Sequence, residues 1–228
     1  MTAVAYTLVP TLAVILGSLV ALVRRPGASF VSTMQHLAAG LIFAATAIEI
    51  LPQVTHLADP VATLYGGALG VGSMLALKSL ESRFSGPLVF VAAIGIDILI
   101  DGLVLGLAFI AGSKAGILLT IALTLEVLFI GLTLTAKLGA AMASRLRVMA
   151  TVVALALLLP LGAALAVPVA TLSPFYTAGF LTFGVMALLF LVTEELLVEA
   201  HERPDTAFIS AMFFVGFLAL LTIEEILL

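Results

Sequence analysis

Long apolar segments follow one another along nearly the whole chain, with polar residues gathered in short stretches between them. A helix needs about 20 apolar residues to cross a bilayer, whereas a barrel strand alternates in polarity and is about 10 residues long. These segments are long and apolar throughout, so the pattern predicts transmembrane helices. Pro, Gly and charged residues divide the chain into eight predicted spans, numbered 1 to 8: 3–23, 31–54, 61–80, 87–112, 115–137, 147–169, 174–200 and 207–228.

Composition agrees with a single transmembrane domain over residues 1–228. The chain is 63% hydrophobic and 10% charged, whereas soluble domains are about a quarter charged. Little sequence remains for a soluble domain. No cysteine is present, which excludes disulfides and thiolate metal ligands. No basic segment precedes span 1, so it is expected to be a true span and not a signal peptide.

The basic residues predict the orientation of the spans. Cytoplasmic connections carry an excess of Lys and Arg, and here Lys114 alone lies in an even-numbered connection. Both termini are therefore expected outside the cytoplasm. The three tyrosines then fall at outer ends of spans, as in an aromatic belt: Tyr6, Tyr65 and Tyr176. The basic residues of the odd-numbered connections are Arg24, Arg25, Lys78, Arg83, Lys137, Arg145, Arg147 and Arg203.

Three acidic residues stand near the middle of spans 4 and 5. Asp97 and Asp101 are one helical turn apart and share a face, and Glu126 lies at a similar depth. Each charge at mid-bilayer costs roughly 2.5–3.5 kcal/mol. Protonation or pairing with a buried cation is the structural alternative, but all nine basic residues lie at span ends or in connections. The pattern therefore favours a functional ion site.

Spans 4 and 5 also resemble each other. DILIDGLVL (97–105) aligns without gaps on EVLFIGLTL (126–134), matching Asp97 with Glu126 and Gly102 with Gly131. Because the two spans run in opposite directions, this predicts an inverted-repeat transporter with spans 4 and 5 at its centre. The two glycines are expected to let these spans approach each other closely.

Further ionisable residues lie on either side of the midplane acids and extend a polar path through the membrane. In span 2, His36 lies toward the predicted cytoplasmic end and Glu49 toward the outer end. Near the cytoplasmic end of span 7 stand Glu195, Glu199 and His201. The alternatives are a hydrogen-bonded interfacial histidine for His36 and a solvated helix end for Glu199 and His201. A solvated terminus is the expected reading of Glu224 and Glu225 at the end of span 8.

These motifs resemble the ZIP (Zrt/Irt-like protein) family of divalent-metal transporters over nearly the whole chain. Shared features are the eight spans, the predicted external termini, H-x-A-A-G…E-x-L-P in span 2, Asp101-Gly102 in span 4 and E-E-L-x-x-E-A-H in span 7. The resemblance to a bacterial-type member implies a location in the bacterial inner membrane. It also implies that metal passes from outside to the cytoplasm.

The chain departs from that family at its metal-binding motifs. Asp97-Ile98 replaces the usual His-Asn of span 4, and Glu126 takes the place of a His or Gln in span 5. Val127 and Ile130 are apolar where the family has polar or ligating residues, and Val198 replaces a proline. The resemblance therefore implies that one of two adjacent metal sites has lost its ligands. The remaining site contains no nitrogen ligand.

The sequence favours a divalent-cation transporter without enzymatic activity or a resident cofactor. Zinc, manganese and iron(II) are candidate substrates. Asp97, Asp101 and Glu126 would form the midplane site, Glu49 would lie at the entry, and Glu195, Glu199, His36 and His201 would relay the ion out. A cation/proton antiporter or channel is the alternative. An intramembrane aspartyl protease is disfavoured because its Gly-x-Gly-Asp signature is absent. Expected partners are the metal ion and the bilayer, with no nucleic acid and with a homodimer left open.

Overall fold

The computed structural model describes residues 2–23, 27–83, 86–141, 144–201 and 206–227. These residues form helices and no strands, and they include eight helical spans long and apolar enough to cross a membrane. All eight predicted spans are confirmed, with ends that differ by a few residues, and the protein is an all-α multi-pass membrane protein. The spans are Ala3–Val23, Ala28–Leu57, Pro60–Leu80, Leu88–Ala111, Ser113–Gly139, Arg145–Thr171, Pro174–Ala200 and Ala207–Ile226.

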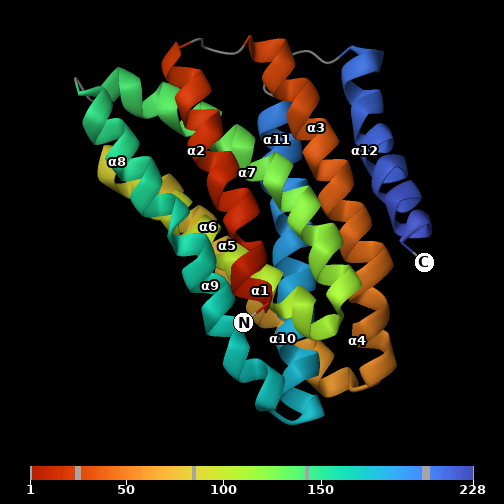
Figure 1. Ribbon diagram of the computed structural model, residues 1–228. Coiled ribbons are helices and arrows are strands. Elements are labelled where there is room, and N and C mark those ends of the chain that lie inside the picture. Colours follow the sequence, from red (N-terminus) through yellow and green to blue (C-terminus); the bar gives the residue numbers. More distant parts are fainter. Residues whose placement is uncertain (1, 24–26, 84–85, 142–143, 202–205, 228) are drawn as a thin grey trace.

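Four of these spans are divided into shorter helical elements. Figure 1 shows α12 at one edge of the bundle beside α3, and α8 and α9 at another edge. Spans 1 and 2 comprise α1 (Thr2–Tyr6), α2 (Leu8–Val23), α3 (Ala28–Ala45), η1 (Thr46–Ile50) and α4 (Leu51–Leu57). Spans 3 to 5 are α5 (Pro60–Arg83), α6 (Pro87–Ala111) and α7 (Ser113–Ala141). Spans 6 to 8 comprise α8 (Arg145–Ala156), α9 (Leu158–Ala166), η2 (Val167–Thr171), α10 (Pro174–Phe190), η3 (Leu191–Leu196), α11 (Leu197–Ala200) and α12 (Ala207–Ile226).

Proline explains the breaks within spans 1 and 6. A proline in a helix lacks the N–H for its backbone hydrogen bond, and its ring clashes with the carbonyl of the residue four positions earlier. That residue is Tyr6 for Pro10 and Ala156 for Pro160, and α1 and α8 end at these two residues. The helix resumes one residue later in both spans.

Spans 2 and 7 each contain a π-helical segment next to acidic residues. η1 carries Glu49, and η3 carries Glu194 and Glu195. A π-helical turn inserts an extra residue, which changes the direction of the side chains that follow, and such turns are frequent at functional sites. Pro52 follows η1 closely, but Val198 stands at the matching place after η3, so the second π-helix forms without a proline.

Glycines bring the backbones of four pairs of helices into close contact in the described ranges. A Cβ at Gly102 of α6 would lie 2.0 Å from the carbonyl oxygen of Leu159 in α9, and one at Gly131 of α7 would lie 2.2 Å from that of Val14 in α2. Contacts this short exist only because these residues lack side chains. The other two pairs are α3 with α12, through Gly40 and Gly216, and α5 with α10, through Gly66 and Gly70.

The predicted partners of Gly102 and Gly131 were therefore wrong. Spans 4 and 5 do contact each other, but their glycines face outward from this contact, toward spans 6 and 1. The physical reason is geometric. A helix has several faces, and a small residue indicates close packing without indicating which neighbour provides it.

The four glycine-packed pairs support the predicted inverted repeat. If span 4 corresponds to span 5, then its partner span 6 corresponds to span 1. The remaining two pairs are span 3 with 7 and span 2 with 8, and the π-helices decide that span 7 matches span 2 and span 3 matches span 8. The same correspondence relates the two proline breaks in spans 1 and 6 and the two π-helices in spans 2 and 7. Each related pair runs in opposite directions, as an inverted repeat requires.

Two glycines of α7 allow a test of this packing. Gly131→Ala should destabilise the protein by about 1–3 kcal/mol, because the new methyl group must push α2 away. Gly139→Ala is the matched control, since a Cβ there meets nothing within 4 Å. It should instead stabilise the helix by up to about 1 kcal/mol. Thermal unfolding of both variants in detergent measures the difference, and equal melting temperatures would contradict the packing described.

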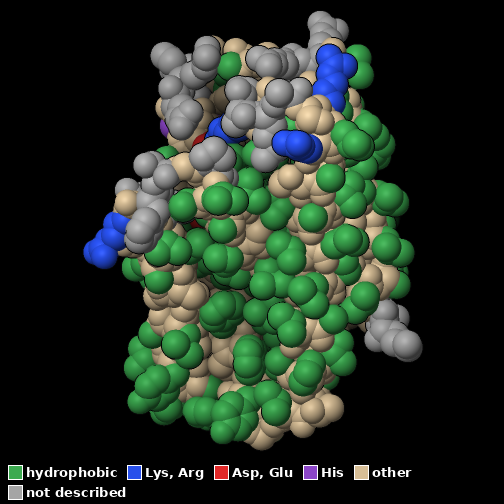
Figure 2. Space-filling view, turned by 90° about the vertical axis from the view of Figure 1, so that its left-hand side faces the viewer, with side chains coloured by type: hydrophobic (Ala, Val, Ile, Leu, Met, Phe, Trp, Pro, Cys, Tyr) green, Lys and Arg blue, Asp and Glu red, His purple; other side chains and the backbone are tan. Residues whose placement is uncertain are grey.

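The outer surface of the bundle is largely apolar. Figure 2 shows hydrophobic side chains over most of one face, while no Lys or Arg side chain is visible in the lower part of that face. Large apolar side chains such as Leu64, Leu69 and Phe208 are about 70% exposed: 71%, 67% and 69%. Exposed apolar surface of this extent fits contact with lipid.

Candidate functional site

An acidic cavity enters the bundle from one end. Its volume is about 250 Å³, enough for several water molecules at about 30 Å³ each. Spans 3, 4, 5 and 7 form its walls. The titratable residues that line it are Asp97, Glu126, Glu194, Glu195, Glu199, Lys78 and Lys137.

Helical periodicity places these side chains on the cavity wall. On α7, Glu126, Ile130, Thr133 and Lys137 are spaced at three or four residues and therefore share one face. The π-helix η3 brings Glu194 and Glu195 to the opposite wall. The cavity thus runs from the buried Glu126 to the exposed Lys137.

Glu126 lies at the closed end of the cavity. Its side chain is 1% exposed, and neither carboxylate oxygen has a hydrogen-bond partner among the described residues. Asp101 is 2% exposed, and its Oδ2 also lacks a partner there. Burying a carboxylate without donors or a countercharge costs several kcal/mol, so such groups need a bound proton or cation.

Electrostatic repulsion links the midplane acids to one another. Asp101 is repelled by Glu126 and Glu195, and Glu126 by Asp97 and Glu195. The predicted midplane residues therefore belong to one acidic cluster, to which span 7 adds Glu195. Within the described ranges, however, no three His, Asp or Glu side chains converge closely enough to hold a metal ion in this conformation. Asp101 is also not among the residues that line the cavity.

Lysines pair with the acids at the cavity mouth. Lys78 Nζ is 2.6 Å from Glu194 Oε2, and Lys137 Nζ is 3.3 Å from Glu199 Oε1. Gln35 Nε2 also donates to Glu199 Oε2, at 2.6 Å. Glu199 is thus not merely solvated at a helix end. The sequence interpretation missed Lys78 and Lys137 as cavity residues because their long side chains reach inward from span ends. It also missed Gln35 and Glu194, whose contacts depend on how spans 2 and 7 are rotated. The helical spacing that places Lys137 on the same face as Glu126 could have predicted that Lys137 lines the cavity.

The two histidines of the predicted exit relay lie together beside the cavity. Their rings are 5.0 Å apart, and His36 Nδ1 is 2.9 Å from the carbonyl oxygen of Ser32. Ser32 Oγ in turn donates to the Ala200 carbonyl at 2.9 Å, which ties α3 to α11. His36 is buried and His201 exposed, and neither lines the cavity. Of the predicted exit residues, Glu195 and Glu199 alone belong to its wall.

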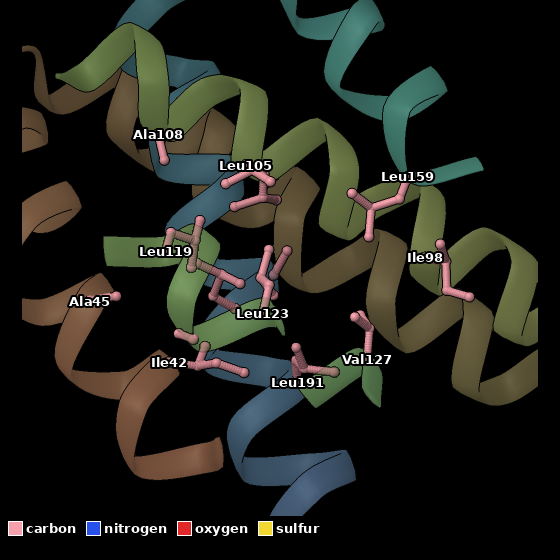
Figure 3. Packing of buried hydrophobic residues seen from close by; sticks show 14 of the residues in the cluster. Ile42, Ala45, Ile98, Leu105, Ala108, Leu119, Leu123, Val127, Leu159 and Leu191 are labelled. Atoms are coloured by element: carbon pink, nitrogen blue, oxygen red, sulfur yellow. The ribbon is translucent and has the colours of Figure 1, made fainter. Parts of the chain in front are cut away.

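Tightly packed apolar side chains separate the acidic cluster from the other end of the bundle. Figure 3 shows Ile42, Leu105, Leu119 and Leu123 converging from α3, α6 and α7. These four residues, with Ala45 and Ala108, have 0% exposure. We call these six residues the apolar plug. This conformation therefore opens toward the end that holds Lys78 and Lys137 and is closed toward the other.

Glu49, the predicted entry residue, lies beyond the plug. It is paired with Lys114, whose Nζ is 3.5 Å from Glu49 Oε1. Lys114 also pairs with Glu224 Oε1. The side chain of Glu224 is 13% exposed, so its interpretation as a solvated terminus was wrong, whereas Glu225 is exposed as expected.

No family model and no curated protein matches this chain. A functional assignment therefore depends on the motifs and on the geometry of the acidic cavity. Eight apolar helices around a buried ionisable cluster are the features of a membrane transporter.

Proposed function

We propose that the protein is a divalent-cation transporter related to the ZIP family, and that its ion site is built from Asp97, Asp101 and Glu126. The observation that carries the proposal is Glu126: a fully buried carboxylate without a hydrogen-bond partner among the described residues, at the closed end of an acidic cavity. A cation of high charge offsets both the desolvation of such a group and its repulsion by neighbouring acids.

The one-ended cavity supports alternating access. A carrier exposes its site to one side at a time, and in this conformation the plug closes one side. The ion would leave past Glu195 and Glu199. Lys78 and Lys137 neutralise Glu194 and Glu199 at the mouth, so these acids hold a departing ion less strongly than the cluster inside.

Uptake by purified protein in sealed liposomes tests the proposal. Manganese, iron(II) and zinc are supplied outside, and accumulation is measured with an internal fluorescent indicator alongside a pH dye. Metal accumulation above empty liposomes is expected. Proton movement driven by a monovalent cation, without metal uptake, would instead establish the antiporter alternative and overturn the assignment.

We further propose that the cavity opens to the cytoplasm and that both termini lie outside it, in the inner membrane of a bacterium. Lys78 and Lys137 stand at the cavity mouth, where cytoplasmic lysines are expected. Tyr6, Tyr65 and Tyr176 are exposed, as residues of an aromatic belt would be. Arg24, Arg25 and Arg203, which also predict this orientation, lie outside the described residues.

A reporter that is active only in the cytoplasm should be silent when fused after Leu228, because eight spans return the chain to its starting side. Fusion within the connection between spans 7 and 8 is the matched control and should be active. An active reporter after Leu228 would reverse the orientation.

A further inference from the structure

Lys114 joins three spans at the end of the bundle away from the cavity. It comes from the first turn of α7 and pairs with Glu49 in η1 and Glu224 near the end of α12. The side chains are partly buried, with 29% exposure for Lys114 and 13% for each acid. Lys114 is also the one basic residue outside the odd-numbered connections.

Helix dipoles give no reason for these charges to stand where they do. The N-terminus of a helix carries partial positive charge, which disfavours Lys114 in the first turn of α7. The C-terminus carries partial negative charge, which disfavours Glu224 in the last turn of α12. Each residue is therefore unfavourable to its own helix. The attraction between Lys114 and Glu224, which belong to different spans, compensates for this unfavourable interaction with the helix dipoles.

Glu49 and Glu224 converge on a single ammonium group. Without that group, two partly buried carboxylates would face each other, and their repulsion would push spans 2 and 8 apart. Partial burial also makes these pairs stronger than fully exposed ones, which contribute little. Lys114 thus turns a repulsive contact into an attractive one.

The apolar plug lies next to the cluster of Lys114, Glu49 and Glu224, on the side of the acidic cavity. Ala45 immediately precedes the π-helix that carries Glu49, and Leu119 lies little more than one turn from Lys114 on α7. Movement of η1 away from α7 would separate the plug residues of α3 from those of α7. The cluster and the plug therefore close the same end of the bundle.

We propose that Lys114 is a latch: it holds spans 2, 5 and 8 together at the closed end, and this end opens when the ammonium leaves at least one of its two carboxylates. The proposal rests on the proposed transport function, because a carrier must open this end to load its ion. Its test requires no knowledge of the ion.

Cysteine labelling measures the opening, because the native chain contains no cysteine. Ala45→Cys places a thiol in the plug, and purified protein in lipid nanodiscs is treated with a membrane-impermeant maleimide. Labelling should be slow when Lys114 is present. Lys114→Gln should raise the rate about tenfold, a change typical of coupled conformational equilibria. Lys114→Arg should keep the rate low.

Two control thiols separate latch opening from general loosening. Thr133→Cys lines the cavity at the other end and should be labelled no faster in the Lys114→Gln background than with native Lys114, because opening of the latched end does not open the cavity further. Ala163→Cys is fully buried between α9 and α6 and should stay unlabelled in both backgrounds. Faster labelling at Ala163→Cys in the Lys114→Gln background would show loosening of the whole bundle and overturn the latch.

Charge reversal provides a test that survives poor folding of the single variant. Lys114→Glu combined with both Glu49→Lys and Glu224→Lys restores the two opposite-charge contacts with reversed sign and should return labelling of Ala45→Cys toward its slow rate. An unchanged labelling rate in Lys114→Gln, or a fast rate in the variant with all three charges reversed, would overturn the proposal. Either result leaves metal uptake unaddressed, so failure of the latch is distinguishable from failure of the transport function.

Discussion

Metal uptake is expected to fall by about a hundredfold or more in Glu126→Gln, because loss of this carboxylate costs the site several kcal/mol of ion stabilisation. Asp101→Asn should have an effect of the same kind. Both substitutions preserve shape and remove only charge. The result is measured as the initial rate of uptake into liposomes at equal amounts of folded protein.

The same two variants should fold at least as well as the native protein. Glu126 and Asp101 are buried and repel neighbouring acids, so neutralising either relieves repulsion instead of breaking a salt bridge. Their melting temperatures should equal or exceed that of the native chain. Loss of uptake through unfolding would be seen as a lower melting temperature.

Glu225→Gln is the matched control, since Glu225 is exposed at the far end of α12. It removes the same charge without touching the cavity and should leave uptake unchanged. If Glu126→Gln takes up metal at the native rate, the closed end of the cavity is not part of the transport path. The proposed ion site would then be incorrect.

Asp97→His is expected to shift metal preference toward zinc over manganese by about tenfold, because imidazole favours zinc whereas carboxylate oxygens suit harder ions. The three proposed ligands are all carboxylates, and the chain has no cysteine. Native protein should therefore tolerate manganese and iron(II) well. Competition between zinc and manganese in the liposome assay measures the shift.

Thr133→His controls for the mere presence of an imidazole in the cavity. Thr133 lines the same wall as Glu126 but lies two turns nearer the mouth. Its substitution should leave the preference nearly unchanged. Strong zinc preference in the native protein, together with no effect of Asp97→His, would exclude Asp97 as a metal ligand.

The proposed ion site shows how much of a site can be predicted from the sequence. The spacing of Asp97 and Asp101 and the depth of Glu126 follow from helix geometry and span boundaries, and the structure places all three in one acidic cluster. Which acids line a cavity depends on the rotation of each helix. Asp101 is buried in the acidic cluster without lining the cavity, while Glu195 enters the cluster from a π-helix for which no proline gives a signal.

Span positions and the breaks in spans 1 and 6 depend on local properties. Twenty apolar residues are long enough to cross a bilayer wherever they stand, and Pro10 and Pro160 interrupt their helices through their own rings. These features need no knowledge of neighbouring helices. The sequence was therefore sufficient to predict eight spans and an all-α membrane fold.

Contacts between spans depended on the tertiary structure. Gly102 and Gly131 were recognised as packing residues, yet their partners proved to be spans 6 and 1, because a helix can use any face for close approach. The ion pairs of Lys114 join residues far apart in the sequence, so no local pattern could reveal them. The hydropathy of a span depends only on its own residues. The rotation of each helix and the pairing of charges between helices depend on all eight spans together.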